Sequence, residues 1–395
     1  MSTSCTFTFT HDPKEIYDIS GKALKLTTSE DIKEIIENLS KYEKVTKIDI
    51  SGNTISDEPS KDLADFIKNT PAIFENLVEC NFADIYTSRL VDEVVKSLDL
   101  FSEAFLKCEK LTYINLSDNA FGLRTIDILE KFIAEKVSLK HLILSNNGMG
   151  PFAGERIGKA LTYLSQAQTK KYGKTILETF ICGRNRLENG SAKYISLGLY
   201  SFAESLKTVR LYQNGIRPEG IHFLIEGLLN CNVLECIDLQ DNTFTSKPGT
   251  KFAEGMPKWA NSLVELNLND CLIKNEGSRA ILTQFLSVEF KKLETLKLQY
   301  NEILQETLES VIIPIFESNH LPSLKLLEIS GNIFEEESEA IEALQELYTG
   351  ELDELDEFEE LDSEEEDSEE EEEELSEKVD FEDLIEGLSG LKLQQ

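Results

Sequence analysis

The 395-residue sequence contains few of the residues that build catalytic or metal centres. It has four histidines, which lie far apart, and seven cysteines, an odd number without any C-x-x-C pair. A disulfide framework or a zinc site is therefore not expected. The sequence also lacks an H-E-x-x-H segment, a serine nucleophile elbow and the protein-kinase signatures. These absences argue against a self-contained catalyst.

Long apolar runs and basic clusters are missing as well. No stretch of about 18 apolar residues occurs, and the first twelve residues are polar. The formal net charge is −35, with 74 acidic against 39 basic residues. Such a chain should repel nucleic-acid phosphate and anionic lipid, and should favour a basic protein surface. We therefore expect a reduced cytoplasmic protein without nucleic-acid or membrane partners.

A repeated phrase dominates what is present. It reads Leu, two variable residues, an apolar residue, one variable residue, an apolar residue, two variable residues and Asn. It occurs ten times, clearly so at Leu111 to Asn119 and Leu139 to Asn147. The first and last ninth positions, Asn53 and Asn332, lie nine repeats apart, a mean of 31 residues. Only a stacked solenoid needs the same buried positions in every turn.

The repeat length leaves room for a short strand and an α-helix in each repeat. Helical spacing of apolar residues is clear at 126–133 and 221–229. The sequence thus predicts an α/β leucine-rich repeat solenoid of ribonuclease-inhibitor type, a crescent with a concave parallel sheet and convex helices. We expect an N-terminal segment and cap over 1–44, with a first strand within 19–26. The crescent and its last helix should span 45–348, and the ninth-position Asn should bond neighbouring main chain in a ladder.

The residues from 349 onward read as an acidic tail. Residues 351–395 hold 23 acidic and 2 basic residues, so the segment should be disordered. Ser363 and Ser368 are followed by acidic residues and are candidate phosphorylation sites. The end, around 379–388, has helical spacing, which fits either a partner-binding helix or a frayed terminus.

A possible phosphate-binding loop and a histidine suggest chemical roles that the sequence does not support. Gly173-Lys174-Thr175 resembles the end of a phosphate-binding loop, but Gln168 stands where that loop requires Gly. His141 falls at an outward strand position, where we expect it to be solvated.

Two repeats depart from the pattern at the ninth position. One has Cys271, which can still donate weakly to the backbone and suggests drift. The other has Ile85, followed shortly by Arg89. For Arg89, an ion pair with Asp84 or Asp92 at a helix start is the simplest interpretation.

The eighth positions should lie along one rim, at the ends of the strands. They carry Asn, Gln, Arg, Asp and Tyr, side chains that make directional contacts with protein partners. An ordinary solvated edge remains an equal alternative on composition alone. The rim residues are Asp118, Asn146, Arg184, Gln213, Asp241, Asp270 and Tyr300.

Several longer phrases, followed by the acidic tail, resemble the short fungal form of the GTPase-activating proteins of the Ran GTPase. The resemblance covers about residues 15–375 and is far more specific than a general leucine-rich consensus. The phrases are 51–55, 116–122, 146–148, 181–190, 213–218 and 239–244.

The resemblance implies that the chain stimulates GTP hydrolysis by Ran in its GTP form and serves nucleocytoplasmic transport. It implies no arginine finger. Asn146 would instead support the catalytic Gln of Ran, and Arg89 would support the interface. GTP and magnesium would belong to the partner, and a Ran-binding accessory protein is left open. The resemblance also implies that Asp241 is a contact residue at the rim. Taken together, the rim and the resemblance predict the partner-binding residues Arg89, Asp118, Arg184, Arg186, Gln213, Asp241 and Asp270.

Other functional classes compete with this hypothesis. The chain could be a non-catalytic leucine-rich repeat module that binds or inhibits a basic protein. It could also act as a chaperone of basic proteins through its acidic tail. Turnover of many GTP molecules per copy would exclude the former, and deletion of the tail would abolish the latter.

Overall fold

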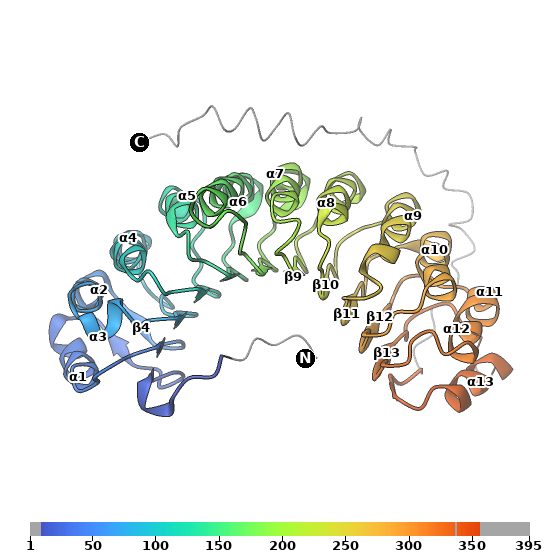
Figure 1. Cartoon of the computed structure of the whole chain (residues 1–395), viewed down its shortest axis with the longest axis horizontal. Coiled ribbons are helices and arrows are strands. Elements are labelled where there is room, and N and C mark those ends of the chain that lie inside the picture. The colour runs from blue at the N-terminus through green and yellow to red at the C-terminus, as the bar shows by residue number, and fades with distance from the viewer. Residues whose placement is uncertain (1–8, 336–337, 356–395) are drawn as a thin grey trace. The chain divides into compact units, whose positions relative to one another are not determined.

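The computed structural model describes residues 9–335 and 338–355. They fall into two compact units, an N-terminal unit that ends at Leu206 and a C-terminal unit that begins at Lys207. In each unit the strands form one layer and the helices another, with strand and helix alternating along the chain (Figure 1). This confirms the predicted leucine-rich repeat solenoid.

The N-terminal unit has a parallel sheet in which each strand pairs with the strand of the next repeat. Its order is β1-β3-β5-β6-β7-β8. The fourth residue of each repeat is in register with its neighbours, so that Cys80, Ile114 and Leu142 stack in the core without exposure. The strands are β1 Ile16–Asp18, β3 Lys47–Asp49, β5 Glu79–Asn81, β6 Tyr113–Asn115, β7 His141–Ile143 and β8 Thr179–Ile181, beside a small sheet of β2 Lys25–Leu26 and β4 Thr54–Ile55.

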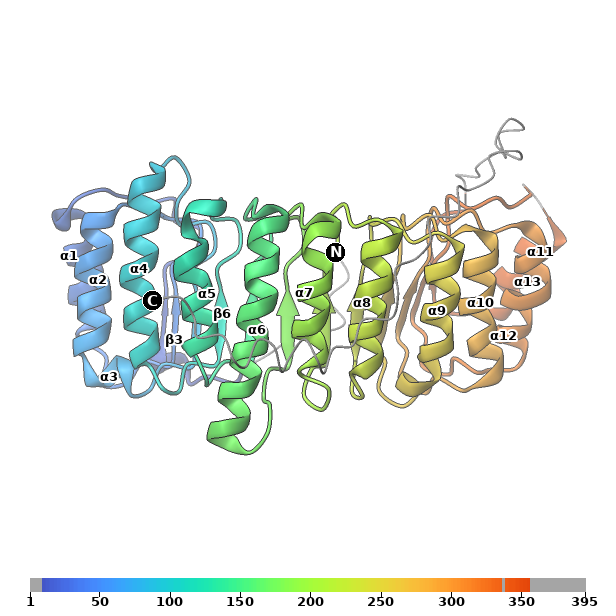
Figure 2. The same cartoon turned by 90° about the horizontal axis from the view of Figure 1, so that it is seen from above.

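The helices of the N-terminal unit pack side by side over this sheet (Figure 2). The longest of them, α6, begins at Gly150-Pro151. Pro suits the first turn because it lacks a backbone N–H, and the N–H groups of the first turn have no partner within the helix. Its far end projects beyond its neighbours (Figure 2). The helices are η1 Pro13–Glu15, α1 Ser29–Leu39, α2 Asp57–Asn69, α3 Pro71–Phe74, α4 Val91–Lys107, η2 Leu123–Thr125, α5 Ile126–Glu135, α6 Gly150–Tyr172 and α7 Glu188–Tyr200.

The C-terminal unit repeats the same plan with the order β9-β10-β11-β12-β13-β14, again parallel. Its strands are β9 Thr208–Arg210, β10 Cys236–Asp238, β11 Glu265–Asn267, β12 Thr295–Lys297, β13 Leu326–Glu328 and β14 Glu351–Leu352. Its helices are α8 Pro218–Asn230, α9 Ser246–Gly255, η3 Met256–Trp259, α10 Lys274–Ser287, α11 Gln305–Thr307, η4 Leu308–Ile312, α12 Ile313–Glu317 and α13 Glu339–Leu347.

The predicted asparagine ladder is present. Asn147 is fully buried, and its side-chain Nδ2 donates to the carbonyls of Leu116 and Leu144, each at 3.0 Å. Its Oδ1 accepts from the backbone N–H of Asn119 at 2.9 Å. Each Asn thereby satisfies backbone groups of two turns that would otherwise be buried without partners.

The two repeats without Asn at the ninth position differ in how much of the ladder they keep. Cys271 keeps a weak form of it, because its Sγ donates to the carbonyl of Leu239 at 3.3 Å. Ile85 has no side-chain donor, and its backbone N–H donates to Oδ1 of Asn119. The ladder is thus interrupted on only one side of that repeat.

The boundaries of the repeat stack differ from those expected. The first strand of the sheet is β1, slightly before the expected 19–26. At the other end, Glu351–Leu352 form β14, although the sequence assigns them to the tail. Asp353 then accepts from the backbone N–H groups of Ile329 and Ser330 and so completes the last turn.

Residues near the N-terminus cover part of the sheet face that points away from the helices. Phe9 makes edge contacts with the rings of Tyr113 and His141. His11 bonds to Thr46 and Glu79, each at 2.9 Å. The prediction that His141 is solvated is therefore wrong, because a distant segment shields it and its Nδ1 bonds to the Thr179 hydroxyl.

The suspected phosphate-binding loop is the end of α6. Gln168 is buried in that helix, where its amide bonds to the carbonyls of Val137 and Leu139. Gly173 ends the helix in the left-handed conformation, with φ of 74°. The segment therefore performs a structural role.

Candidate functional site

The eighth position of every repeat has a left-handed backbone. The φ values run from 50° at Asp84 to 62° at Asp118 in the non-glycine residues. The first and last repeats carry Gly52 and Gly331 at this position, at 69° and 66°. The non-glycine residues are Asp84, Asp118, Asn146, Arg184, Gln213, Asp241, Asp270 and Tyr300.

This conformation makes the side chains at the eighth position informative. Glycine adopts positive φ without penalty, whereas other L-residues lose roughly 1 kcal/mol there, Asn and Asp less than most. Arg184, Gln213 and Tyr300 have no such intrinsic preference. Tyr300 is half-buried beside Gly331, whereas the side chains of Arg184 and Gln213 are exposed and are therefore candidates for contact with a partner.

Asn146 lies at this rim in the N-terminal unit. Its side chain is exposed, with a φ of 54°, and its backbone N–H donates to the carbonyl of Gly183 at 2.9 Å. The next residue, Asn147, is buried and carries the ladder bonds. Asn147 alone makes the ladder bonds, and the side chain of Asn146 is therefore not needed for the stacking of the repeats.

Asp118, one repeat earlier, orients the Asn146 amide. The Nδ2 of Asn146 donates to Oδ1 of Asp118 at 2.7 Å. Because a carboxylate only accepts hydrogen bonds, this contact requires the amide nitrogen to face Asp118. One N–H and the carbonyl oxygen Oδ1 of Asn146 therefore remain for contact with another molecule. Sequence reasoning placed both residues on the rim but did not foresee this bond.

Arg89 is engaged within its own chain. Its Nε donates to the Thr54 hydroxyl at 2.8 Å, and a terminal nitrogen donates to the carbonyls of Leu26 and Thr54. A further bond reaches the Thr27 hydroxyl. Arg89 thus ties the loop of the second repeat to the small β2–β4 sheet of the cap.

The simplest sequence interpretation of Arg89 is wrong. Asp92 pairs with Arg124, and Asp84 bonds to the Thr87 hydroxyl. Arg89 instead lines a cavity of about 380 Å³ at the edge of the cap, together with Lys25 and Asp84.

Arg184, at the rim of the N-terminal unit, and Arg186, two residues later, are both basic. Both side chains are exposed, and both backbones are left-handed, at 56° and 55°. Neither forms an ion pair with any residue described in the structure. Their guanidinium groups are therefore free to recognise carboxylates on another protein.

The remaining predicted residues belong to the C-terminal unit. Gln213, Asp241 and Asp270 are exposed at the same repeat position. Burial, and then the neighbouring carboxylate of Asp241, raise the pKa of Asp270. This pair would gain from a cationic partner group, since like charges on adjacent repeats repel each other.

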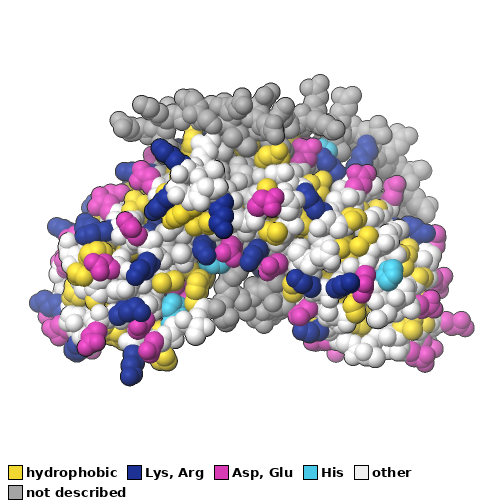
Figure 3. Space-filling view, viewed as in Figure 1, with side chains coloured by type: hydrophobic (Ala, Val, Ile, Leu, Met, Phe, Trp, Pro, Cys, Tyr) yellow, Lys and Arg dark blue, Asp and Glu magenta, His cyan; other side chains and the backbone are white. Residues whose placement is uncertain are grey.

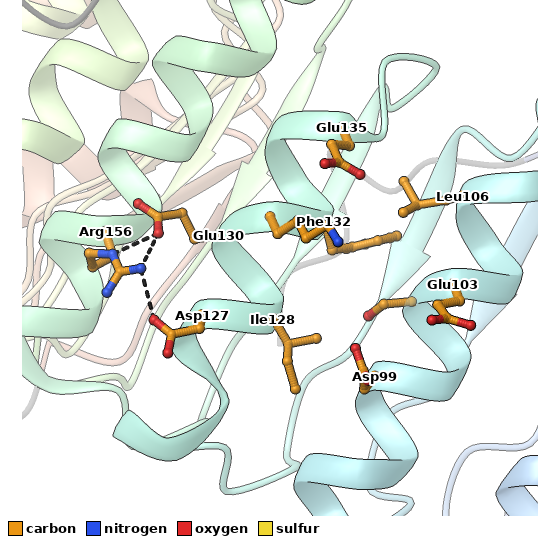
Figure 4. Close-up of a pocket in the computed structure, with 11 residues that line it drawn as sticks. Asp99, Glu103, Leu106, Asp127, Ile128, Glu130, Phe132, Glu135 and Arg156 are labelled. Atoms are coloured by element: carbon orange, nitrogen blue, oxygen red, sulfur yellow. Dashed lines mark hydrogen bonds and ion pairs between the residues drawn. The ribbon is translucent and has the colours of Figure 1, made fainter. Parts of the chain in front are cut away.

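Other surfaces are less distinctive. A cavity of about 740 Å³ lies in the helix layer between α4 and α5, and its lining includes five carboxylates, Asp99, Glu103, Asp127, Glu130 and Glu135, beside apolar residues such as Leu106 and Phe132 (Figure 4). Arg156 crosses one end and binds Asp127 and Glu130. On the face shown in Figure 3, positive and negative side chains alternate. Within 9–335 and 338–355, no helix is long and apolar enough to cross a membrane.

Comparison with known proteins identifies relatives. A Ran GTPase-activating protein 1 from Saccharomyces cerevisiae is 56% identical over 339 residues, which is 86% of this chain and 83% of that protein. A Ran GTPase-activating protein 2 from Caenorhabditis elegans is 38% identical over 54% of this chain and 22% of that protein. A Ran GTPase-activating protein 1 from Xenopus laevis is 34% identical over 50% of this chain and 33% of that protein.

Comparisons with family models and with solved structures were also made. No family model matches the chain. Among solved structures, one from the yeast Rad7–Elc1 complex aligns with a TM-score of 0.43 and 13% identity, over 78% of this chain and 76% of that chain. The similarity to the yeast protein extends over most of both sequences, and it includes the repeats that carry Asn146 and Asp118. The chain belongs to the family of Ran GTPase-activating proteins.

Proposed function

We propose that this chain stimulates GTP hydrolysis by Ran in its GTP form, with Asn146 as the residue that acts on the partner's active site. Membership of the family supports Ran as the partner. One observation supports Asn146 as the acting residue. Asn146 is exposed, has a left-handed backbone and is oriented by Asp118, while Asn147 alone maintains the ladder.

In this mechanism Asn146 positions the catalytic Gln of Ran. Its Oδ1 accepts a hydrogen bond from the Gln amide, which in turn orients the attacking water. Holding the attacking water and the Gln side chain in a reactive geometry can account for several powers of ten in rate. An Asn suits this role because it adds no charge and offers both donor and acceptor. The GTP and magnesium belong to the partner, and the chain contributes no cofactor.

The mechanism uses no arginine finger. The guanidinium of Arg89 already makes four hydrogen bonds to its own cap, so that moving it onto a phosphate would break them. Arg89 instead supports the interface by fixing the loop of the second repeat. Arg184 and Arg186 recognise acidic groups around the site. Gln213, Asp241 and Asp270 bind the partner from the C-terminal unit.

The cellular setting is part of the proposal. Stimulating hydrolysis on Ran outside the nucleus would serve nucleocytoplasmic transport, and we place the protein in the cytoplasm on that ground. A Ran-binding accessory protein is compatible with this arrangement. Neither nucleic acid nor membrane is needed as a partner.

A turnover assay separates this proposal from a non-catalytic binding module. GTP-loaded Ran is mixed with the chain at a hundredfold lower concentration, and phosphate release is followed over time. We expect complete hydrolysis, since an activator is released after each cycle. Release limited to about one phosphate per copy, or a block of hydrolysis, would instead support the binding or inhibitor module.

A further inference from the structure

Large apolar side chains are exposed at the starts of three helices in the N-terminal unit. The exposed fractions are 73% for Leu90, 56% for Leu123 and 55% for Phe152. Val91, beside Leu90, is 48% exposed. Among the described residues only three other large apolar side chains are comparably exposed, and they lie elsewhere. We call Leu90, Leu123 and Phe152 the apolar strip.

The three residues lie on neighbouring elements. Leu90 is the N-cap of α4, Leu123 begins η2, and Phe152 is in the first turn of α6. The short helix η2 contacts both α4 and α6. An ion pair between Asp92 and Arg124 joins the first turn of α4 to η2. The strip therefore follows the starts of three neighbouring helices, α4, η2 and α6.

The strip shares its register with the rim. Its members follow the eighth-position residues Asp84, Asp118 and Asn146 by six, five and six positions. Hydrogen bonds bring these segments close to the rim: the backbone N–H of Gly122, next to Leu123, donates to the carbonyl of Asn147 at 3.1 Å, and that of Gly150 donates to the carbonyl of Asn185 at 2.9 Å. Six positions after the eighth, the C-terminal unit has Glu219, Lys247, Glu276 and Glu306. At the same offset the N-terminal unit has Glu58 and Arg124 besides Leu90 and Phe152, so the apolar residues are confined to the N-terminal unit but do not occur in each of its repeats.

Folding does not explain this pattern. An apolar residue at a helix start can stabilise the fold by packing against the following turn, but such packing buries it. Leu90 is mostly exposed, so that it contributes little in this way. Large apolar residues that are grouped on neighbouring elements and left in water are typical of a surface that binds another protein.

We propose that the apolar strip is a docking surface for the GTPase domain of the partner, and that it sets affinity without taking part in hydrolysis. This inference rests on the proposed function. Its occupant is an apolar ridge bordered by acidic groups, because hydrogen bonds bring the starts of η2 and α6 close to Asn147 and Asn185, and the neighbours of Asn185, Arg184 and Arg186, are exposed without an ion pair among the described residues. Apolar contacts formed equally in the ground and transition states lower KM and leave kcat unchanged.

The test compares two exposed residues of one helix. Phe152→Ser removes a member of the strip, and Tyr172→Ser removes an aromatic side chain, 40% exposed, at the opposite end of α6. Leu123→Ser and the double variant Leu123→Ser/Phe152→Ser extend the series. Initial rates are measured over a range of Ran–GTP concentrations, and thermal unfolding confirms that each variant is folded. Affinity for Ran loaded with a non-hydrolysable GTP analogue is measured in parallel.

We expect each single strip variant to raise KM and Kd about tenfold, and the double variant to raise them further. The kcat should stay within twofold, and Tyr172→Ser should match wild type. Folded strip variants with unchanged KM would overturn the inference. If kcat still depended on Asn146 in that case, the proposed function would stand.

Two further outcomes would also overturn the inference. A wild-type chain that does not stimulate Ran would overturn the strip and the proposed function together. Loss of self-association in Phe152→Ser, with KM unchanged, would assign the strip to a second copy of this chain.

Discussion

The two units share one backbone plan but differ in what they place on it. At the eighth position the N-terminal unit has Asp118, Asn146 and Arg184, all left-handed and exposed. The C-terminal unit has Gln213, Asp241 and Asp270 in the same conformation. Among the residues that the structure describes, only the N-terminal unit combines an amide oriented at the eighth position with exposed apolar helix starts. The repeat therefore provides equivalent positions, and the side chains at these positions make one unit the candidate for catalysis.

Buried cations separate the units as well. Arg210 in the C-terminal unit binds both oxygens of Glu265 and one of Asp238, each at 3.0 Å. Lys136 in the N-terminal unit is 2% exposed, and its Nζ donates to the carbonyl of Cys108 rather than to a carboxylate. Burial raises the pKa of Asp238 although Arg210 opposes it, and burial lowers the pKa of Lys136 to about 8.

Removing these cations should change stability in opposite directions, which gives the largest expected effects. Arg210→Met deprives two buried carboxylates of their counter-charge and should destabilise its unit by roughly 3–5 kcal/mol. Lys136→Met removes a buried cation and should stabilise the other unit by up to about 3 kcal/mol at pH 7. Urea unfolding of both variants measures the difference. Destabilisation by both substitutions would remove this contrast between the units.

The Lys136 effect also has a defined pH dependence. The folded pKa of about 8 lies below the unfolded value of 10.5, so that the unfolded chain binds more protons between these values. The stability of wild type should therefore rise with pH across this window as far as Lys136 controls it. The advantage of Lys136→Met should be complete below pH 8 and shrink towards pH 10.5. An advantage that stays constant to pH 10.5 would contradict a buried lysine of lowered pKa.

The next largest effect concerns the two rims. Asn146→Ala should leave the fold intact and lower the maximal rate by about 10²–10³, roughly 3–4 kcal/mol, as for the loss of one transition-state contact. Asp241→Ala occupies the same repeat position in the C-terminal unit and should change mainly KM. Single-turnover hydrolysis over a range of activator concentrations up to saturation measures the maximal rate and KM of both variants. Equal losses of maximal rate in Asn146→Ala and Asp241→Ala would contradict a catalytic role for the N-terminal unit alone.

A smaller effect is expected at Arg184. Arg184→Ala should raise KM about tenfold and weaken its dependence on salt, because an exposed charge acts chiefly on encounter and affinity. The kcat should stay within twofold, and Arg186→Ala provides a neighbouring comparison. A loss of kcat comparable to that of Asn146→Ala would indicate an arginine finger after all.

The smallest effect should come from the acidic tail. Residues 356–395, with Ser363, Ser368 and the apolar spacing around 379–388, lie outside the described part of the structure, and our expectations for them remain predictions. The sequence suggests a truncation near Gly350, but that would remove β14 and the bonds made by Asp353. A chain ending at Leu355 should keep its maximal rate and lose only salt-sensitive affinity. An inactive yet folded truncation at saturating concentration would place the tail in the catalytic machinery.

Much of the fold could be predicted because the repeat phrase ties each apolar position to one place in the stack. The helices at 126–135 and 218–230, the Asn147 ladder and the rim register follow from periodicity alone. The environment of His141 and the partners of Arg89 could not be predicted, since they depend on segments distant in sequence, namely Phe9 and the β2–β4 sheet. The left-handed rim could have been suspected from Gly52 and Gly331 at the eighth position. The Asp118–Asn146 bond could not be predicted, because it depends on how two exposed side chains of neighbouring repeats are oriented.

The central claim is that Asn146 acts through the catalytic Gln of Ran. A double-mutant cycle tests it, with maximal single-turnover rates measured for wild-type and Asn146→Ala chains on wild-type Ran and on a Ran variant in which that Gln is Ala. The account predicts strong coupling, so that Asn146→Ala costs about 10²–10³ with wild-type Ran and little once the Gln is absent. Equal losses on both forms of Ran would show that Asn146 acts independently of the Gln, and would contradict the mechanism.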